Sequence, residues 1–490
     1  MLLVPWVGWT MGGMSADTQA SLSVHPDRLL PAQPEVRDVA RRIYATTKDL
    51  PIISPHSHVP PQWLVDDEPW PDPASLLLTP DHYVLRLLHA NGAELSDLGR
   101  GPEGPLPLDE AAARKAWRIL CENYHLFRGT PVKYWFDTTF TEVFGITQVP
   151  SAATADSIYD QVAEKLTQPE FRPRALFERF GISVLATTDD PLDDLVPHRT
   201  LAEDPTFSGR VIPTFRPDRF LELARPDWPE LARRLGEGAD VDTGDYAGYI
   251  AALENRRRYF KEHGAVSSDH SHFDAGTEPL DEAEASRIYA AALRGEVTEA
   301  EAVAFRRHMM SETARMATED GLVMTLHHGV RRNHDPDNFA RFGADAGSDI
   351  PVAMEFTEAL RPLLGRYGNH PNLNLVVFTI DETVFSRELA PMAGFYRSLY
   401  VGVPWWFLDA PEAIRRFRGA VTETAGFYRT SGFIDDTRAF LSIPTRHDMS
   451  RRLDAAYLAE LVAEHRLTEE EALATAHDLV TTIPKQVFKL

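Results

Sequence analysis

One kind of segment recurs along the chain and constrains its fold more than any other feature. It is a short β-branched or apolar run that ends in polar residues, which the interior of a strand would not tolerate. Runs of this length without alternation are typical of strands that are buried on both faces, as in parallel sheets. The eight examples are PIISPHSH near residue 51, ISVLATTDD near 182, RVIPTFRPD near 210, GAVSSDHSH near 264, GLVMTLHHG near 321, LNLVVFTID near 373, LYVGVPWWFLD near 399 and SGFIDDTR near 431.

Helical patterns separate these runs. Two of them are SETARMATED and APEAIRRFRGAVTETAGF, and in the second Pro411 suits the first turn of a helix. Eight candidate strands that alternate with helices predict an α/β fold, a (β/α)8 barrel of the TIM type. The alternative is a doubly wound open sheet, which is disfavoured because the glycine-rich turn that usually follows its first strand is missing.

Three connections are too long for simple crossovers and predict helical insertions. The largest, residues 60–175, follows the first candidate strand and is predicted to form a helical subdomain over the mouth of the barrel. Residues 217–262 and 274–318 predict two further helical excursions. A single barrel with such insertions would account for residues 25–490 of the 490-residue chain.

Composition excludes several classes of protein. A net charge of -23 disfavours electrostatic binding to nucleic acid or to an anionic membrane. The N-terminal MLLVPWVGWTMGG is too short to span a bilayer and lacks the basic start of a signal peptide, so we expect a disordered leader over residues 1–24. The single cysteine, Cys121, excludes an intrachain disulfide and fits a reducing cytoplasm. We therefore expect a cytoplasmic protein with a small-molecule substrate and no nucleic-acid or membrane partner.

Polar residues at the ends of the candidate strands are expected to share one site, because the C-terminal ends of barrel strands converge on one face. His56 and His58, two positions apart on an extended segment, point to the same side of the chain and predict a metal-binding pair. A ring of imidazoles and carboxylates suits a divalent metal. The remaining members of the ring are Asp189, Asp190, Arg216, Asp218, Asp269, His270, His327, His328, Trp405, Trp406, Asp435, Asp436 and Arg438.

Some of these residues also suit a structural role. His327 and His328 are adjacent, so only one of them can enter the site from a strand. Trp405 suits a core or subunit contact as well as the lining of a sugar pocket. Asp189 and Asp190 are equally suited to function and to capping the helix that follows them.

The blocks of this sequence resemble, in the same order, the uronate isomerases, a branch of the amidohydrolase superfamily. The resemblance runs from about residue 25 to the C-terminus. It implies a barrel that binds one divalent metal, usually zinc with manganese as the alternative. It also implies interconversion of D-glucuronate and D-fructuronate, or of D-galacturonate and D-tagaturonate. The blocks are HPDRLLPA, PHSH, DHYVLRLLHANG, TTDDPLDDLVPH, IPTFRPD, SSDH, VMTLHHGVRRN, FGADAGSDIP, VPWWFLD and DDTRAFLSIPTRHDMSRR.

Six positions match residues that have roles in this family. They are the first-strand metal ligands His56 and His58, the last-strand aspartate Asp436, the fifth-strand histidine His327, the loop tyrosine Tyr83 proposed for proton transfer, and Arg438 two residues beyond the metal aspartate. Two positions depart from the family pattern. Ser54 replaces an acidic residue, and Asp435 replaces the threonine that usually precedes the last-strand aspartate. Strand alternation lets only one of the two aspartates face the metal, and the spacing to Arg438 favours Asp436.

We interpret the chain as an aldose–ketose isomerase of hexuronates that works through a metal-stabilised enediol. Asp436 and Tyr83 are the predicted proton-transfer residues. His327 and Arg438 are expected to hold the enediolate oxygens, since a guanidinium can bind two oxygens at once.

The remote carboxylate of a uronate needs a cation of its own. Arg216 is the first choice for it and Arg331 the second, and Trp405 is expected to line the sugar pocket. Apolar helical segments such as the WWF region often associate, which predicts a homo-oligomer.

Two other interpretations compete with the isomerase. A metal-dependent hydrolase of a sugar-acid lactone, ester or amide would use the same ligands to activate water. It would not require the loop tyrosine or an arginine-rich pocket. A sugar-acid binding protein without catalysis is the third interpretation, and Ser54 is its only support.

Overall fold

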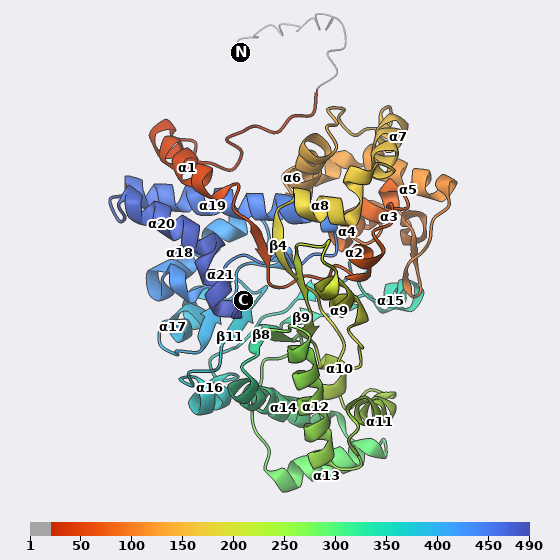
Figure 1. Cartoon of the computed structure of the whole chain (residues 1–490), viewed down its shortest axis with the longest axis vertical. Helices are drawn as coiled ribbons and strands as arrows, with labels where there is room; N and C mark the ends of the chain where they lie inside the picture. The colour runs from red at the N-terminus through yellow and green to blue at the C-terminus, as the bar shows by residue number, and fades with distance from the viewer. Residues whose placement is uncertain (1–20) are drawn as a thin grey trace, which may run out of the picture.

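The computed structural model describes residues 21–490 (Figure 1). The predicted leader over residues 1–24 therefore lies, up to residue 20, outside the described residues. Ser21 forms a bridge with Gln148, and the Leu22 amide donates to the Thr147 carbonyl at 2.6 Å.

Parallel strands in two sheets form the centre of the molecule (Figure 1). The first sheet has the order β1–β4–β5 and the second has the order β12–β11–β8–β7–β6. Every pairing within these two sheets is parallel. Their bounds are β1 Ile52–Ser54, β4 Ile182–Ala186, β5 Arg210–Ile212, β6 Thr214–Phe215, β7 Ser267–His270, β8 Val323–His327, β11 Leu375–Phe378 and β12 Leu399–Val401.

Seven of the eight predicted strand segments contain these strands, and β5 and β6 share one of them. Pro213 separates β5 from β6, since proline has no amide hydrogen to give to a ladder. The two sheets meet at a bridge between Asp189 and Phe215. The predicted α/β class with parallel strands is thus confirmed.

The eighth predicted segment, around residues 431–438, forms no strand in the part of the chain that the structure describes. Thr430 makes a single parallel bridge with Val401 of β12. On the other side, the Asp436 amide donates to the His56 carbonyl at 3.3 Å. The segment therefore lies between β12 and the loop after β1, but it does not close an eight-stranded ladder.

The strands are buried on both faces, which explains their continuous apolar sequences. All residues of β8 and β11 are buried. All four residues of β7 are buried as well, although Ser267–His270 are polar. A buried polar strand needs partners for its side chains, so β7 marks a site rather than a plain core element.

The segment after β1, where we expect the largest insertion, is mainly helical and lies at the upper right of Figure 1. Its helices are amphipathic: α5 buries Trp117 and Leu120 on one face, and the Asp109 side chain caps its first turn. A short antiparallel pair, β2 with β3, interrupts the helices. The bounds are α2 Gln62–Asp66, α3 Pro73–Leu77, α4 His82–Ala90, β2 Arg100–Gly101, β3 Gly104–Pro105, α5 Glu110–Glu122, α6 Pro131–Thr138, α7 Ala155–Leu166 and α8 Pro173–Arg179.

The other two predicted insertions form the lower end of the molecule in Figure 1. They pack around an aromatic cluster that includes Trp228, Tyr249, Tyr289 and Phe305. Thr298 forms a capping box at the start of the longest helix, α14. The helices are α10 Asp218–Leu221, α11 Trp228–Ala239, α12 Tyr246–Glu262, α13 Glu282–Leu293 and α14 Glu299–Asp320.

The remaining helices cover the sheets, and Pro411 opens α18 as predicted. Most of α19 is buried, and it packs against α1 and α20. Within residues 21–490, no helix combines the length and the apolarity needed to cross a bilayer. The bounds are α1 Pro34–Thr47, α9 Val196–Glu203, β9 Val330–Arg331, α15 Pro336–Phe342, β10 Ile350–Pro351, α16 Arg361–Tyr367, α17 Ala390–Ala393, α18 Pro411–Ala425, α19 Ile443–Ala463, α20 Glu469–Val480 and α21 Thr482–Phe488.

A buried ion pair joins α18 to α19 and gives a test of this packing. The Arg418 guanidinium donates to both carboxylate oxygens of Asp454 at 2.6 and 2.9 Å, and both side chains are buried. We expect Asp454→Ala to lower the free energy of unfolding by about 3–5 kcal/mol, because it leaves a buried guanidinium unpaired. Urea unfolding followed by circular dichroism measures this loss. Glu423→Gln, which breaks the exposed pair with Arg466, is the control and should change stability little.

Candidate metal centre and active site

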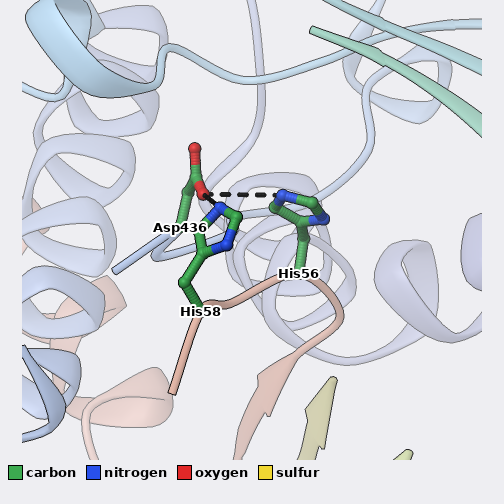
Figure 2. Close-up of side chains that lie close together, drawn as sticks. All are labelled: His56, His58 and Asp436. Carbon is green, nitrogen blue, oxygen red and sulfur yellow. Dashed lines mark ion pairs between the residues drawn. The ribbon is translucent and has the colours of Figure 1, made fainter. Parts of the chain in front are cut away.

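Two histidines and one aspartate meet where the loop after β1 lies beside the segment around residues 431–438 (Figure 2). His56 and His58 lie in the loop directly after β1. The Asp436 Oδ1 atom is 2.9 Å from His58 Nε2 and 3.5 Å from His56 Nε2. The backbone of Asp436 is left-handed, with φ of 43°, which an aspartate tolerates better than most residues. Residues more than 370 positions apart therefore share one cluster.

The neighbouring aspartate points the other way. Asp435 Oδ2 lies 3.1 Å from Nε2 of His447, and both side chains are buried. Asp436 is therefore the aspartate that faces His56 and His58.

The cluster has the donor set that a divalent cation requires. Its ligand atoms lie within 4.8 Å of one another. Burial lowers the pKa of His58 to about 4, so its ring is neutral at pH 7. Burial alone would raise the pKa of the Asp436 carboxyl, but the two imidazoles hold that pKa well below its usual value. Asp436 Oδ1 is buried without a hydrogen bond. Two imidazoles and an ionised carboxylate fit zinc or a similar ion.

A second cluster shares His56 and extends the site along the strand ends. It consists of His56, Asp269 at the end of β7 and His327 at the end of β8. His327 Nδ1 lies 2.6 Å from Asp269 Oδ1, and the Thr325 hydroxyl donates to the same oxygen at 2.9 Å. The His327 and His56 rings are stacked with centroids 4.5 Å apart. His327 Nε2 is buried and has no hydrogen-bond partner. Asp269 therefore fixes the orientation of the imidazole and leaves Nε2 free.

A cavity of about 340 Å³ opens beside His58 and Asp436. Its volume lies in the range of sites for small molecules. The helical insertion contributes Asp81, His82 and Tyr83 to its wall. Its lining contains four arginines and four aspartates, so guanidiniums gather here in a chain of strongly negative net charge and are balanced by carboxylates. The arginines are Arg216, Arg332, Arg438 and Arg446.

Most of the predicted site residues meet here. Tyr83, Arg216, Trp405 and Arg438 line the cavity together with His58 and Asp436, whereas His56 and His327 lie behind its wall. Trp405 Nε1 is buried and has no partner. Asp189 does not line the cavity; its carboxylate accepts from the Thr187 hydroxyl at 2.6 Å and from the Thr214 amide at 3.0 Å.

Arg331 is the exception among the predicted arginines. Its guanidinium lies 4.5 Å from the centroid of the Phe273 ring, and it does not line the cavity. The next residue, Arg332, lines it instead and is held by Asp349 at 3.2 Å and by the Ser271 hydroxyl at 3.2 Å. Neighbouring residues of β9 and the turn after it point in different directions, and the sequence does not show which one faces inward.

Two further residues that line the cavity, Arg446 and His82, were not predicted from the sequence. Arg446 is buried in α19; its Nη1 lies 2.7 Å from Asp409 Oδ2, and its guanidinium lies 3.7 Å from the Trp135 ring and 5.1 Å from the Tyr83 ring. His82 Nε2 is buried without a partner. Both residues belong to helices, so no strand-end signal identifies them.

Aspartate side chains around the cavity hold its arginine side chains in place. Arg438 Nη1 lies 2.8 Å from Asp345 Oδ2. Burial would raise the pKa of Asp345, but Arg438 lowers it to about 2. Arg216 Nε lies 3.0 Å from Asp218 and 3.5 Å from Asp269. These guanidiniums keep further N–H groups for a bound anion, since each carries five.

Comparison with known proteins is consistent across sequence and structure. The model of the family described as glucuronate isomerase matches residues 35–488. The uronate isomerase of Cutibacterium acnes is 56% identical and covers 96% of this chain and 99% of its own. The solved structure of glucuronate isomerase from Caulobacter crescentus has a TM-score of 0.93 at 45% identity, covering 96% of this chain and 97% of its own. That of uronate isomerase from Thermotoga maritima has a TM-score of 0.88 at 29% identity, covering 95% and 99%.

Removing one imidazole tests the metal cluster directly. We expect His58→Asn to weaken Zn²⁺ binding by more than about 100-fold, because the loss of a ligand should exceed the effect of changing its outer partners. Competition with a chromophoric chelator measures the affinity. His198→Asn removes a buried imidazole elsewhere and should bind Zn²⁺ as the parent protein does. Equal affinity in both variants would contradict the assignment of the site.

Proposed function

The chain belongs to the glucuronate isomerase family and catalyses the isomerisation of hexuronates, and from this premise we propose which groups perform the reaction. The resemblance seen in the sequence is thereby confirmed. We propose that the substrates are D-glucuronate, D-galacturonate or both, converted to D-fructuronate and D-tagaturonate. The observation that carries the proposal is the arginine-lined cavity beside the His56–His58–Asp436 cluster.

The proposed cofactor is one divalent cation, zinc or alternatively manganese, held by His56, His58 and Asp436. Their two nitrogens and one oxygen are the support for it. When bound, such a cation supplies Lewis-acid stabilisation of the charge that develops on the substrate oxygens. Asp436 lines the cavity, and Figure 2 shows its second oxygen pointing away from both imidazoles. We assign that oxygen to proton transfer at carbon.

Tyr83 is the proposed partner for proton transfer at a substrate oxygen. Burial holds the pKa of its hydroxyl well above the usual value, so the hydroxyl stays protonated at pH 7 and can donate. Arg446 lies against the Tyr83 ring and is itself held by Asp409. This packing fixes the ring at the cavity wall.

His327 and Arg438 take different roles at the substrate oxygens. Burial lowers the pKa of His327, so the ring is neutral, and its contact with Asp269 places the hydrogen on Nδ1. His327 Nε2 then carries a lone pair and accepts from a substrate hydroxyl. Arg438 remains charged and is the donor that holds an enediolate oxygen.

The remote carboxylate of the substrate is assigned to Arg216, with Arg332 in place of Arg331 as the second candidate. Both line the cavity and both are fixed by acidic partners. Trp405 presents an indole N–H without a partner, which suits a sugar hydroxyl.

We also infer that residues 430–437 occupy the position of the eighth strand in a (β/α)8 barrel, although they do not form a regular strand. Their contacts with Val401 on one side and with the His56 carbonyl on the other support this position.

The homo-oligomer and the cytoplasmic location stay proposals. The WWF region does not support an oligomer, because Trp405 and Trp406 are buried. An exposed aromatic side chain lies elsewhere: Phe395 is 75% exposed.

Heavy water tests the route of the reaction. We expect the zinc-loaded protein to convert D-glucuronate or D-galacturonate in heavy water to ketose that carries deuterium at C1, because an enediol takes a proton from a group that exchanges with solvent. Proton NMR of the product measures the label. Ketose without deuterium would contradict transfer through a group that exchanges with solvent during turnover.

Arg216→Ala tests the carboxylate assignment. We expect kcat/KM for the uronate to fall about 10- to 100-fold, the worth of one charge-assisted hydrogen bond. Inhibition by the matching neutral hexose should change much less, since it has no C6 carboxylate. Equal losses for the uronate and the neutral sugar would reject the assignment.

A further inference from the structure

A second group of imidazoles and carboxylates lies beside the cavity wall, apart from the His56–His58–Asp436 cluster. We propose that Asp218, His270 and His272 bind a second divalent cation. One ligand atom from each lies within 4.8 Å of the others. His270 and His272 are buried, and none of the three residues lines the cavity.

The end of β7 supplies both clusters. Asp269 and His270 are adjacent on this strand, so their side chains point to opposite sides. Asp269 contacts His327 at 2.6 Å, whereas His270 belongs to the cluster with Asp218 and His272. Asp218 begins α10 directly after β6, the strand that pairs with β7. The parallel register of β6 and β7 therefore brings Asp218 to His270.

His272 has the hydrogen-bond arrangement of a metal ligand. Its Nδ1 lies 2.7 Å from Glu222 Oε1, which places the hydrogen on Nδ1 and leaves a lone pair on Nε2. That Nε2 is buried without a hydrogen bond and lies 3.5 Å from Asp218 Oδ1. Metal-bound histidines usually donate their other N–H to an outer carboxylate in this way. Arg306 holds Glu222 in place at 3.2 Å.

His270 contributes a second free nitrogen. The residue is fully buried, its Nε2 lies 3.4 Å from the Ser268 hydroxyl, and its Nδ1 has no partner. A buried polar atom without a partner costs free energy. One nitrogen of His270 lies within 4.8 Å of a ligand atom of Asp218 and of His272, so the imidazole can join them in binding a cation. The His272 carbonyl lies 2.9 Å from His328 Nδ1, which fixes the turn that carries His272.

The carboxylate of Asp218 has room for both a cation and Arg216. Its Oδ2 atom is 3.0 Å from Arg216 Nε, and its Oδ1 atom is the one that faces His272 Nε2. The Ser271 amide lies 3.2 Å from each of the two oxygens. Two imidazoles and one carboxylate oxygen match zinc and related ions. Glu222 and Asp269 add negative charge that offsets the nearby guanidiniums.

Metal counting tests the proposal on the full-length protein. The protein is stripped with a chelator, saturated with Zn²⁺, passed through a desalting column and assayed by mass spectrometry of the metal. We expect two zinc ions per chain for the parent protein and one for His272→Asn. Asparagine retains an N–H that can reach Glu222 but removes the Nε2 lone pair. His308→Asn, which removes a buried imidazole bonded to Tyr246, is the matched control and should retain two.

The outcomes separate this site from the catalytic one. His58→Asn should also bind one zinc ion, and the double variant with His272→Asn should bind none. A single zinc ion in the parent protein, or two in His272→Asn, would overturn the proposal. Loading the parent protein with ¹¹³Cd²⁺ gives a check that needs no variant: two NMR resonances are expected, and one would contradict the second site. Loss of isomerase activity in His58→Asn with two resonances in the parent protein would leave both assignments intact.

Discussion

Pairing between the loop after β1 and the segment before α19 holds the catalytic region together. The Asp436 amide donates to the His56 carbonyl, and the His58 amide donates to the Thr437 carbonyl at 3.0 Å. The Ser57 hydroxyl adds a third contact to the same carbonyl. These bonds fix the spacing between the two imidazoles and the carboxylate. Without these hydrogen bonds, the distances between the two imidazoles and the carboxylate would not be fixed, because the three residues are far apart in the sequence.

The buried charged side chains beside the site are paired with one another in a network. Asp269 contacts both His327 and Arg216, and Arg216 also contacts Asp218. Removing one member of such a network leaves another buried charge unpaired, which costs more than the pair itself contributes. The four cavity arginines are stabilised in this way. A chain with a net charge of -23 can therefore still present several guanidiniums to an anionic sugar.

The sequence was sufficient to predict most strands, and several residues of the candidate site that lie together in the structure, for a physical reason. Buried parallel strands need continuous apolar runs, so β8 and β11 were visible as such. The last segment was harder, because it contains only a short apolar run and carries the polar groups of the site. Its left-handed residues, Gly432 and Asp436, also interrupt an extended ladder. The segment is therefore not a regular strand at the residue that joins the cluster, Asp436.

The cavity wall away from the strand ends was not predictable from local pattern. Arg446 arrives from the first turns of α19 and His82 from the start of α4, and neither helix has a periodicity that identifies a site residue. Arg332 and Arg331 differ only in the direction that β9 and its turn give them. Such positions depend on tertiary packing, which propensity and spacing do not encode.

Strand alternation at the end of β7 has a consequence that reaches beyond one site. Asp269 and His270 extend from the same backbone to opposite sides, so a shift of β7 would move both clusters. Asp218 adds a second link, since one of its oxygens contacts Arg216 and the other faces His272. A cation on the His272 side would draw the Asp218 charge away from Arg216. The guanidinium would then interact more strongly with a substrate carboxylate, and the two sites would be coupled through this one side chain.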